Sequence, residues 1–255
     1  MADYEILSES IPVSMHEDWF DIATTEHFWM QWRFEVFKKI VLKNYPLGQK
    51  LFEIGCGSST FREQIENYYK IPVDGCDLNI NALKSAHQGL GRILQYNIFD
   101  KNPNLINNYD SIFLMDVIEH LDDDITFLKT AAEHGKSGAY VFINVPAGMY
   151  LYSKYDIHVG HVKRYNKATL KQTIISAGLE PLEIIYWGGL LIPIGILRKF
   201  ILSISRNDAN TIHYGFTPPG NIANIFLKTL KSIEVSLPIN TPLGASLFAI
   251  AKVIK

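Results

Sequence analysis

The sequence predicts an α/β fold with a mostly parallel sheet that is covered by helices on both faces. Three observations lead to this prediction. Short apolar runs alternate with amphipathic segments, a glycine loop joins the first of these runs to a helix, and no helix follows the last apolar run, Ser246 to Ile254. Strands separated by helices need right-handed crossovers and therefore run parallel, whereas the last strand is expected to be antiparallel.

The first expected element is an amphipathic helix from Thr25 to Asn44. Its apolar residues recur at helical spacing, and Pro46 and Gly48 mark its end. After it, strand and helix signals alternate up to Pro146. We expect the strands at Lys50–Ile54, Val73–Leu78, Arg92–Tyr96, Ser111–Met115 and Ala139–Val145. We expect the helices between them at Ser58–Tyr69, Ile80–His87 and Asp123–His134.

A different organisation follows Pro146. A loop rich in tyrosine, histidine and glycine leads to a helix at Lys167 to Ala177 and a strand at Glu180 to Trp187. The next segment, Gly188 to Gly244, is far longer than the roughly 2 to 5 residues of a hairpin loop, so it is expected to be an inserted subdomain. Helical patterns within this insertion lie at Leu190–Ile204 and Ile222–Leu237.

These boundaries divide the chain into three parts. Residues 1–48 form an N-terminal helical segment, residues 49–187 and 245–255 form a core domain, and residues 188–244 form the helical insertion. A chain of 255 residues suits one α/β unit of this kind.

Composition and charge exclude several classes of function. Lysine and arginine number 24 against 26 aspartate and glutamate, and a net charge of -2 argues against a nucleic-acid partner. The two cysteines, Cys56 and Cys76, cannot form a disulfide framework, and the N-terminus lacks the layout of a signal peptide. The longest apolar run, Trp187 to Leu197, has 11 residues, short of the roughly 20 that a spanning helix needs. We therefore expect a cytoplasmic protein without a transmembrane segment.

A glycine loop and a later acid indicate a cofactor site. The loop, Glu53 to Thr60, follows a strand and opens a helix, and Gly55 and Gly57 allow the backbone to approach a ligand closely. Asp77 ends the next strand 20 residues after Gly57, the separation at which a carboxylate accepts hydrogen bonds from the ribose hydroxyls of an adenosine cofactor. The alternative is a tight turn that binds no ligand, and the position of Asp77 argues against this alternative.

The residues of the loop distinguish between adenosine cofactors. A nicotinamide dinucleotide would need a third glycine where the helix N-terminus meets the pyrophosphate, and that position is Thr60. The carboxylate of Glu53 would also repel a pyrophosphate. S-adenosylmethionine has no phosphate and carries a sulfonium and an ammonium group, so an acidic residue favours it.

Four segments resemble, in order and spacing, the motifs of class I S-adenosylmethionine-dependent methyltransferases. They are Leu51–Ser59, Gly75–Leu78, Tyr109–Leu121 and Asn144–Pro146. The segment Gly160–Tyr165 is similar to a Gly-His-x-Arg-Arg-Tyr signature of a bacterial branch that is often encoded with enzymes of cell-envelope glycan or lipid biosynthesis. The resemblance implies a Rossmann-like, seven-stranded methyltransferase sheet with an antiparallel last strand and a helical insertion between the last two strands.

The resemblance also implies a cofactor site. It places Glu53, Gly55, Cys56 and Gly57 around the methionine part of the cofactor and Asp77 on the ribose. The remaining residues that it assigns to the cofactor are Leu78, Asn97, Ile98, Met115 and Asp116. The family usually has aspartate at position 97, and Lys163 replaces the first arginine of the branch signature, which removes bidentate anion binding there.

The turn after the fourth strand contains Asp116, Glu119 and His120, which in a helical turn share one face. Three hypotheses remain open for this turn. Glu119 caps and orients its neighbours, or His120 is a general base near the acceptor. In the third, Glu119 and His120 bind a divalent metal together with a later histidine, as similar motifs do in ubiquinone-pathway and small-RNA-terminus methyltransferases. We favour a site without a metal, because this fragment does not complete a ligand set.

The loop after the fifth strand adds further candidates for catalysis, His158, His161, Arg164 and Tyr165. Methyl transfer needs an aligned nucleophile and a proton acceptor rather than a covalent intermediate. The sequence therefore predicts O-methylation of a small-molecule, glycan or lipid-linked acceptor. The alternatives are a metal-assisted methyltransferase of a vicinal-hydroxyl acceptor, an NAD-dependent oxidoreductase and a non-catalytic cofactor-binding protein.

The insertion is expected to cap the acceptor site. Its apolar run, Trp187 to Leu197, together with Phe200, Ile201 and Ile204, is too apolar for a solvated face. It predicts the core of the cap or a contact in a homodimer. Another alternative is a groove for a lipid-linked acceptor or a shallow contact with a membrane surface.

Overall fold

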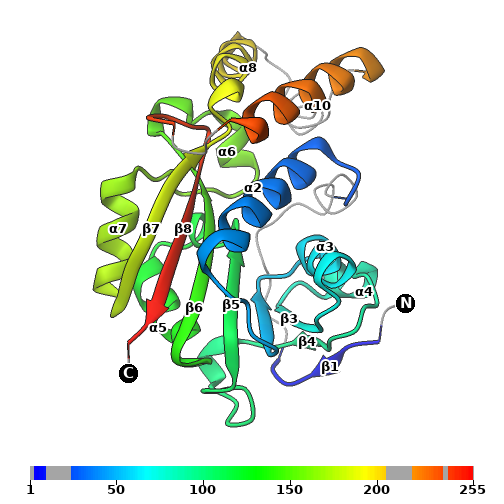
Figure 1. Ribbon diagram of the computed structural model, residues 1–255, viewed down its shortest axis with the longest axis vertical. Helices are drawn as coiled ribbons and strands as arrows, with labels where there is room; N and C mark the ends of the chain where they lie inside the picture. Colours follow the sequence, from blue (N-terminus) through cyan, green and yellow to red (C-terminus); the bar gives the residue numbers. More distant parts are fainter. Residues whose placement is uncertain (1–2, 10–23, 205–219, 238–240, 255) are drawn as a thin grey trace.

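The protein is described here by a computed structural model, which covers residues 3–9, 24–204, 220–237 and 241–254. One sheet of eight strands runs through the molecule in the order β1-β4-β3-β2-β5-β6-β8-β7 (Figure 1). The strands are β1 Glu5–Ile6, β2 Leu51–Ile54, β3 Val73–Asp77, β4 Ile93–Gln95, β5 Tyr109–Met115, β6 Gly135–Pro146, β7 Leu179–Trp187 and β8 Ser246–Val253. The predicted α/β class with a mostly parallel sheet is confirmed.

Helices fill the connections between the strands, close to the expected positions. The α-helices are α2 Phe28–Asn44, α3 Thr60–Tyr69, α4 Ile80–Ser85, α5 Asp124–Glu133, α6 Lys154–His158, α7 Lys167–Ser176, α8 Ile192–Ile204 and α10 Gly220–Ser236. Short 3₁₀ helices are η1 Ile98–Asp100, η2 Ile118–His120, η3 Met149–Leu151 and η4 Gly189–Leu191. In the part of the chain that the structure describes, no helix is long and apolar enough to cross a bilayer.

The sheet has one strand more than the resemblance implied. The added strand, β1, has two residues and pairs in parallel with β4 at the edge of the sheet. Ser8 extends this contact, because its hydroxyl accepts from the Asn97 backbone N–H at 2.9 Å and its carbonyl accepts from the Gln95 amide at 2.9 Å. Two residues are too few to show strand periodicity, so the sequence carried no signal for this strand.

The last strand is antiparallel, as predicted. β8 lies between β6 and β7 and is antiparallel to both. The chain leaves β7 at the carboxyl edge of the sheet and enters the insertion there. It re-enters the sheet from the same edge, so β8 must run in the opposite direction. Its side chains are buried on both faces, which explains the continuous apolar run of Ser246 to Val253.

Successive side chains of the central strands enter different cores. On β5, Ile112 and Leu114 pack with residues of α5 and α7, whereas Phe113 and Met115 pack with residues of α2 and α3. This alternation follows from the two-residue period of a strand. At the centre of the second core the Phe37 ring of α2 makes an edge contact with Phe113 at 5.8 Å between centroids. The first predicted helix is therefore part of the core of the sheet.

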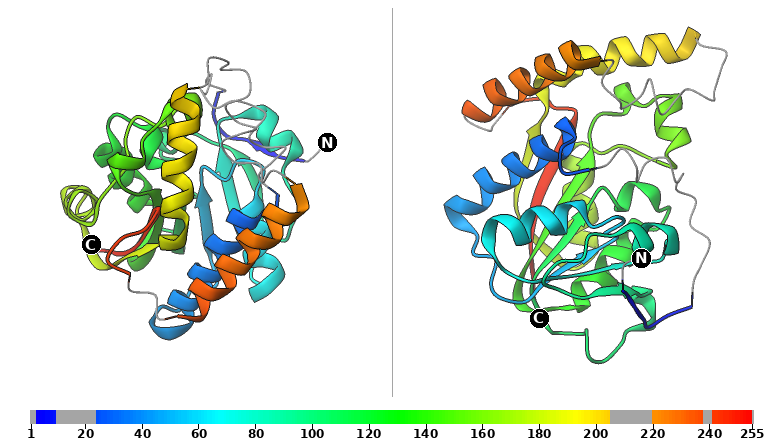
Figure 2. Two further views of the ribbon diagram at one scale, coloured as in Figure 1. Left: turned by 90° about the horizontal axis from the view of Figure 1, so that it is seen from above. Right: turned by 90° about the vertical axis from the view of Figure 1, so that its right-hand side faces the viewer.

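The insertion lies at the carboxyl end of the sheet. In Figures 1 and 2, α8 (yellow) and α10 (orange) occupy this end of the molecule, with α10 beside α2. The Lys39 ammonium of α2 donates to the carbonyls of Val235 and Leu237 at the end of α10. The buried carboxylate of Glu234 accepts from the backbone N–H of Gly188 at 2.5 Å, so α10 is fixed to the start of the insertion.

Candidate functional site

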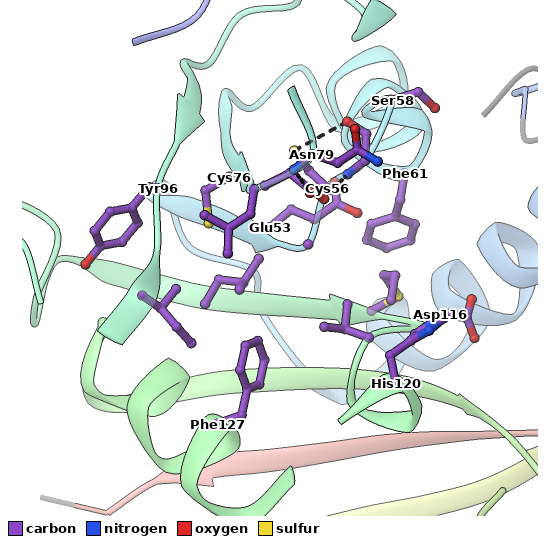
Figure 3. Close-up of a pocket in the computed structure, with 18 of the residues that line it drawn as sticks. Glu53, Cys56, Ser58, Phe61, Cys76, Asn79, Tyr96, Asp116, His120 and Phe127 are labelled. Atoms are coloured by element: carbon purple, nitrogen blue, oxygen red, sulfur yellow. Dashed lines mark hydrogen bonds between the residues drawn. The ribbon is translucent and has the colours of Figure 1, made fainter. Parts of the chain in front are cut away.

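A cavity of about 360 Å³ opens at the carboxyl ends of the central strands (Figure 3). All ten residues that the sequence analysis assigned to a cofactor line it: Glu53, Gly55, Cys56, Gly57, Asp77, Leu78, Asn97, Ile98, Met115 and Asp116. They come from β2, β3 and β5 and from the segments that follow β2, β3, β4 and β5. Figure 3 shows Asp116 and His120 at one side of the cavity and Tyr96 at the other. A cavity of this size accommodates a small organic ligand.

The glycine loop has the backbone geometry that requires glycine. Gly55 has φ +75°, and a Cβ atom there would lie 2.7 Å from the Cγ2 atom of Val117. Its N–H donates to the Cys76 carbonyl at 2.8 Å, which joins the loop to β3. Any side chain at this position would therefore strain the backbone and collide with the opposite loop. The missing side chain leaves the loop backbone exposed to the cavity.

Asp77 fixes the loop and still has acceptor capacity. One carboxylate oxygen accepts from the Gly57 N–H at 2.8 Å, and the other accepts from the Asn79 N–H at 2.8 Å. Each carboxylate oxygen can accept two hydrogen bonds, so both have room for a further donor from a ligand. A pair of vicinal hydroxyls is a suitable donor pair, as the sequence analysis expected of a ribose.

Glu53 is a buried acid beside the same loop. Its side chain is 2% exposed, and its Oε2 atom has no hydrogen-bond partner. Burial raises the pKa of Glu53 to about 8, although Arg33 and Arg62 oppose the shift. A buried carboxylate without a partner is costly, and a cationic ligand group beside it would remove that cost. This observation fits an ammonium group and does not fit a pyrophosphate.

Another part of the cavity lining is apolar. Leu78 and Ile98 line it, as expected for residues beside an adenine ring, and the rings of Phe99 and Phe127 lie near them. The side-chain oxygen of Asn97 accepts from the Phe99 N–H at 3.1 Å and caps η1. Asn97 therefore shapes this wall through the backbone as well as facing the cavity.

The sequence analysis missed Arg33, which lines the cavity from α2. Its Nη1 atom is 2.6 Å from an Asp116 carboxylate oxygen, and the other oxygen accepts from the Asn144 amide at 2.6 Å. The Trp187 indole donates to the Asn144 side-chain oxygen at 2.9 Å. Arg33 stands among the apolar residues of an amphipathic helix, and this isolated cation on an apolar face was a signal that could have found it.

The acid and histidine turn differs from the expected helical turn. Asp116 has φ +64°, and the 3₁₀ turn begins only at Ile118. Asp116 therefore faces Arg33, and it does not share a helix face with Glu119 and His120. The cause is the pair of contacts from Arg33 and Asn144, which holds Asp116 in a left-handed conformation. The capping role considered for Glu119 is absent, because neither of its side-chain oxygens has a hydrogen-bond partner.

Glu119, His120 and His161 form one cluster, and their ligating atoms lie within 4.8 Å of one another. The His161 Nε2 atom is 3.8 Å from Glu119 Oε1, and the imidazole centroids of His120 and His161 are 4.8 Å apart. Burial, together with the Asp116 charge, raises the pKa of Glu119. Burial and then His161 lower the pKa of His120 to about 3. The turn and the downstream loop thus meet beside the cavity.

The other residues proposed for catalysis lie away from the cavity lining. Arg164 donates through Nε to Asp156 at 2.7 Å, and Tyr165 donates through its hydroxyl to Asp124 at 2.5 Å. Both side chains are buried and hold the loop in place. His158 ends α6 and does not line the cavity. Of the five candidates, His120 lines the cavity, and the His161 imidazole contacts the His120 imidazole without lining the cavity itself.

Asp156, which the sequence analysis did not single out, orients His161. Its Oδ1 atom lies 3.0 Å from the His161 Nδ1 atom, and the Arg164 guanidinium binds the same oxygen. Burial alone would raise the pKa of Asp156, but the hydrogen bonds from His161 and Arg164 outweigh it and lower that pKa. An ionised Asp156 favours the tautomer of His161 that has its proton on Nδ1, and the Nε2 atom then lies 3.8 Å from Glu119 Oε1.

Comparisons with known proteins agree with this geometry. A family model described as a methyltransferase domain matches residues 28–184, more than half of the chain. A S-adenosylmethionine-dependent methyltransferase from Archaeoglobus fulgidus has 16% identity over 88% of this chain and 97% of that chain, with a TM-score of 0.55. The plantazolicin methyltransferase BpumL, solved with S-adenosylhomocysteine, has 15% identity over 93% and 88% of the two chains, with a TM-score of 0.59.

A further similar structure is phosphoethanolamine N-methyltransferase 2 from Haemonchus contortus, solved with S-adenosyl-L-methionine. It has 16% identity, and the match covers 96% of this chain and 61% of that chain with a TM-score of 0.55. A comparison with proteins of curated function gave no match. At these identities the solved structures show a common fold and leave the acceptor open.

The lowered pKa of His120 leads to a first prediction. We expect the imidazole to stay neutral from about pH 5 to pH 8, because burial disfavours its charged form. Long-range ¹H–¹⁵N spectra of the histidine rings measure this directly, and the His120→Gln variant assigns the signal. A titration midpoint near the ordinary value of about 6.5 would contradict the prediction.

Proposed function

The chain belongs to the class I S-adenosylmethionine-dependent methyltransferases, and from that premise we propose that it methylates a hydroxyl oxygen of an acceptor bound beside His120. The observation that carries this proposal is the position of His120. Among the histidines that the structure describes, His120 is the one that lines the cavity, together with Glu53 and Asp116. The family membership removes the support for a nicotinamide-dependent oxidoreductase.

The residues of the cavity fit the cofactor. S-adenosylmethionine, when bound, supplies a methyl carbon that its sulfonium group has activated. Glu53 would balance the ammonium group, Arg33 would face the carboxylate, and Asp77 would accept from the ribose hydroxyls. The apolar side with Leu78 and Ile98 would hold the adenine. Each of these roles follows from the charge and burial of the residue.

His120 is placed to orient the acceptor hydroxyl, and it takes the proton as a general base where the bound acceptor raises its pKa. Its imidazole is neutral at physiological pH because burial lowers its pKa. It is fixed against His161, whose position depends on Asp156. Such a group serves as a general base when it lies within hydrogen-bond reach of the acceptor hydroxyl. Proximity and orientation, rather than a covalent intermediate, would supply the remaining rate enhancement.

A second candidate function is metal-assisted O-methylation of a vicinal-hydroxyl acceptor. The specific observation in its favour is the third ligand that the structure adds: His161 joins Glu119 and His120. Two imidazoles and a carboxylate suit a first-row divalent metal, and the contact from Asp156 to His161 is typical of the groups that orient metal-bound histidines. The metal would lower the pKa of the acceptor hydroxyl and replace the protein base.

The insertion, residues 188–244, would form the cap of the acceptor site. α8 packs against η3 and α6, the segments that follow β6 and carry the support of His161. The acceptor would be a small molecule, a glycan or a lipid-linked compound that enters below this cap. We place the reaction in the cytoplasm, where the two free buried cysteines, Cys56 and Cys76, stay reduced.

The role of Asp77 gives a second prediction. Asp77→Ala should weaken S-adenosylhomocysteine binding by roughly 2 to 4 kcal/mol, because two charge-assisted hydrogen bonds are lost. Isothermal titration calorimetry measures the change. Asp74→Asn is the matched control, because Asp74 lies on the same strand and binds Arg92 outside the cavity. Equal affinities for wild type and Asp77→Ala would overturn the cofactor site.

Glu53 gives a third prediction, on pH dependence. Its pKa of about 8 keeps it protonated at pH 7, and a cationic group beside it would lower that pKa. Binding of S-adenosylhomocysteine should therefore release a proton, and affinity should rise with pH until it levels off above about pH 8. Calorimetry at pH 7 in buffers of different ionisation enthalpy counts the proton. Glu53→Gln should abolish this release, and a wild type that releases none would refute the assignment.

A fourth prediction separates the two candidate functions. His120→Ala should lower methyl transfer from radiolabelled S-adenosylmethionine to a polar-lipid extract about a hundredfold, with the affinity for S-adenosylhomocysteine nearly unchanged. His158→Ala, a change away from the cavity, should leave transfer intact. If a metal is required, chelation should abolish transfer and a divalent ion should restore it. Insensitivity to chelator supports the protein base, and full activity of His120→Ala excludes both versions.

A further inference from the structure

The insertion turns apolar side chains toward solvent at one end of the molecule. On α8 the exposed ones are Ile194, Ile196, Leu197, Phe200, Ile201 and Ile204. At about 100° per residue these positions form one continuous face of the helix. The corresponding exposed side chains of α10 are Ile225, Phe226, Ile233 and Leu237. A helix on the surface of a globular protein usually turns such a face to the core, so this surface has the character of a binding site.

Contacts on the inner side of α8 fix this orientation. Leu202 is buried with Tyr155 and Val159 of the α6 segment. The guanidinium of Arg198 lies over the Tyr155 ring at 4.5 Å from its centroid, and the Lys199 ammonium donates to the Tyr150 carbonyl at 2.7 Å. Arg198 and Leu202 therefore lie on the protein side of α8, and the exposed apolar residues lie on its outer side.

The charge of the insertion identifies the occupant. Its described residues include the cations Arg198, Lys199, Lys228 and Lys231 and a single acid, Glu234. Glu234 is buried and accepts from the backbone at the start of the insertion, so it does not contribute to the outer surface. Arg198 lies over Tyr155, and the Lys231 ammonium lies 3.5 Å from the Gln31 side-chain oxygen of α2, so Lys199 and Lys228 are the described cations left for the outer surface, which carries no described acid. An anionic surface complements it.

A second copy of the chain fits this surface less well than a lipid bilayer does. A symmetric dimer would place the same patch against itself, so Lys228 would enter an interface with no described acid of the patch to balance it. α8 has 13 residues, too few to span a bilayer but sufficient to lie in its interface. Exposed apolar residues flanked by lysines are typical of helices that bind such an interface.

We propose that α8 and α10 dock on the surface of an anionic lipid bilayer. Their apolar faces enter the boundary between headgroups and acyl chains, and Lys228 lies near the phosphates. Met149 and Tyr150 of η3 and Ile157 of α6 are also exposed and adjoin α8, which extends the docking surface toward the loop of His161. The consequence, that the acceptor is a lipid or lipid-linked hydroxyl compound taken from this bilayer, rests on the proposed function.

Vesicle cosedimentation of the full chain tests the docking without an acceptor. The probes are phosphatidylcholine vesicles with and without phosphatidylglycerol. We expect binding to the anionic vesicles that weakens with salt, and a loss of tenfold or more for the double variant Leu197→Gln with Phe200→Gln, since two exposed apolar anchors are removed. Lys228→Gln should weaken binding to the anionic vesicles by about fivefold. Leu90→Gln is the matched control, because Leu90 and Phe200 are both 62% exposed.

Three results would overturn the proposal. They are no binding to anionic vesicles, equal binding of the double apolar variant and wild type, and a dimer in light scattering that the double variant dissociates while vesicles are not bound. Titration with S-adenosylhomocysteine on the same samples shows that each variant is folded. The same titration separates the docking proposal from the proposed function. Vesicle binding can be lost while cofactor binding persists, and cofactor binding can be lost while vesicle binding persists.

Discussion

The ion pair between Arg33 and Asp116 connects the parts of this protein on which its site depends. It joins α2 to the end of the central strand β5 over a separation of 83 residues, and Asn144 and Trp187 extend the connection to β6 and β7. The pair is partly buried, so removing one partner should cost less than the roughly 3 to 5 kcal/mol of a fully buried pair. It also holds Asp116 in a left-handed conformation, which turns the following residues toward the loop of His161.

Burial sets the ionisation of the site. Desolvation raises the pKa values of Glu53 and Glu119 and lowers that of His120, so burial favours the neutral form of each group. Such a site is prepared for a cationic ligand beside Glu53 and for a hydrogen-bond donor beside His120. Asp156 behaves differently. Burial would raise its pKa as well, but hydrogen bonds from His161 and Arg164 outweigh burial and lower that pKa, so this carboxylate stays ionised.

The insertion enters and leaves the sheet at the carboxyl edge, where parallel α/β sheets bind their ligands. One consequence is the antiparallel last strand. Another is that α8 and α10 lie at the carboxyl end of the sheet (Figure 2), where the residues that line the cavity also lie. The proposed membrane-docking surface and the cavity for the methyl donor would then lie at the same edge of the sheet. The loop after β6, which contains α6, connects them through Asp156 and His161.

The sequence by itself determined the features that depend on local backbone geometry. The strand-loop-helix context of Gly55, the position of Asp77 at a strand end and the alternation of strands and helices are properties of short segments, and all ten predicted cofactor residues line one cavity. Only the tertiary structure decided which distant side chains meet. The packing of α2 and α6 against the carboxyl edge brings three pairs together: Arg33 with Asp116, His161 with Glu119, and Asp156 with His161. Contacts with distant parts of the chain likewise decided the strand β1 and the outward orientation of α8. Two residues are too short to specify the strand with which β1 pairs. The apolar pattern of α8 does not specify the segment against which it packs.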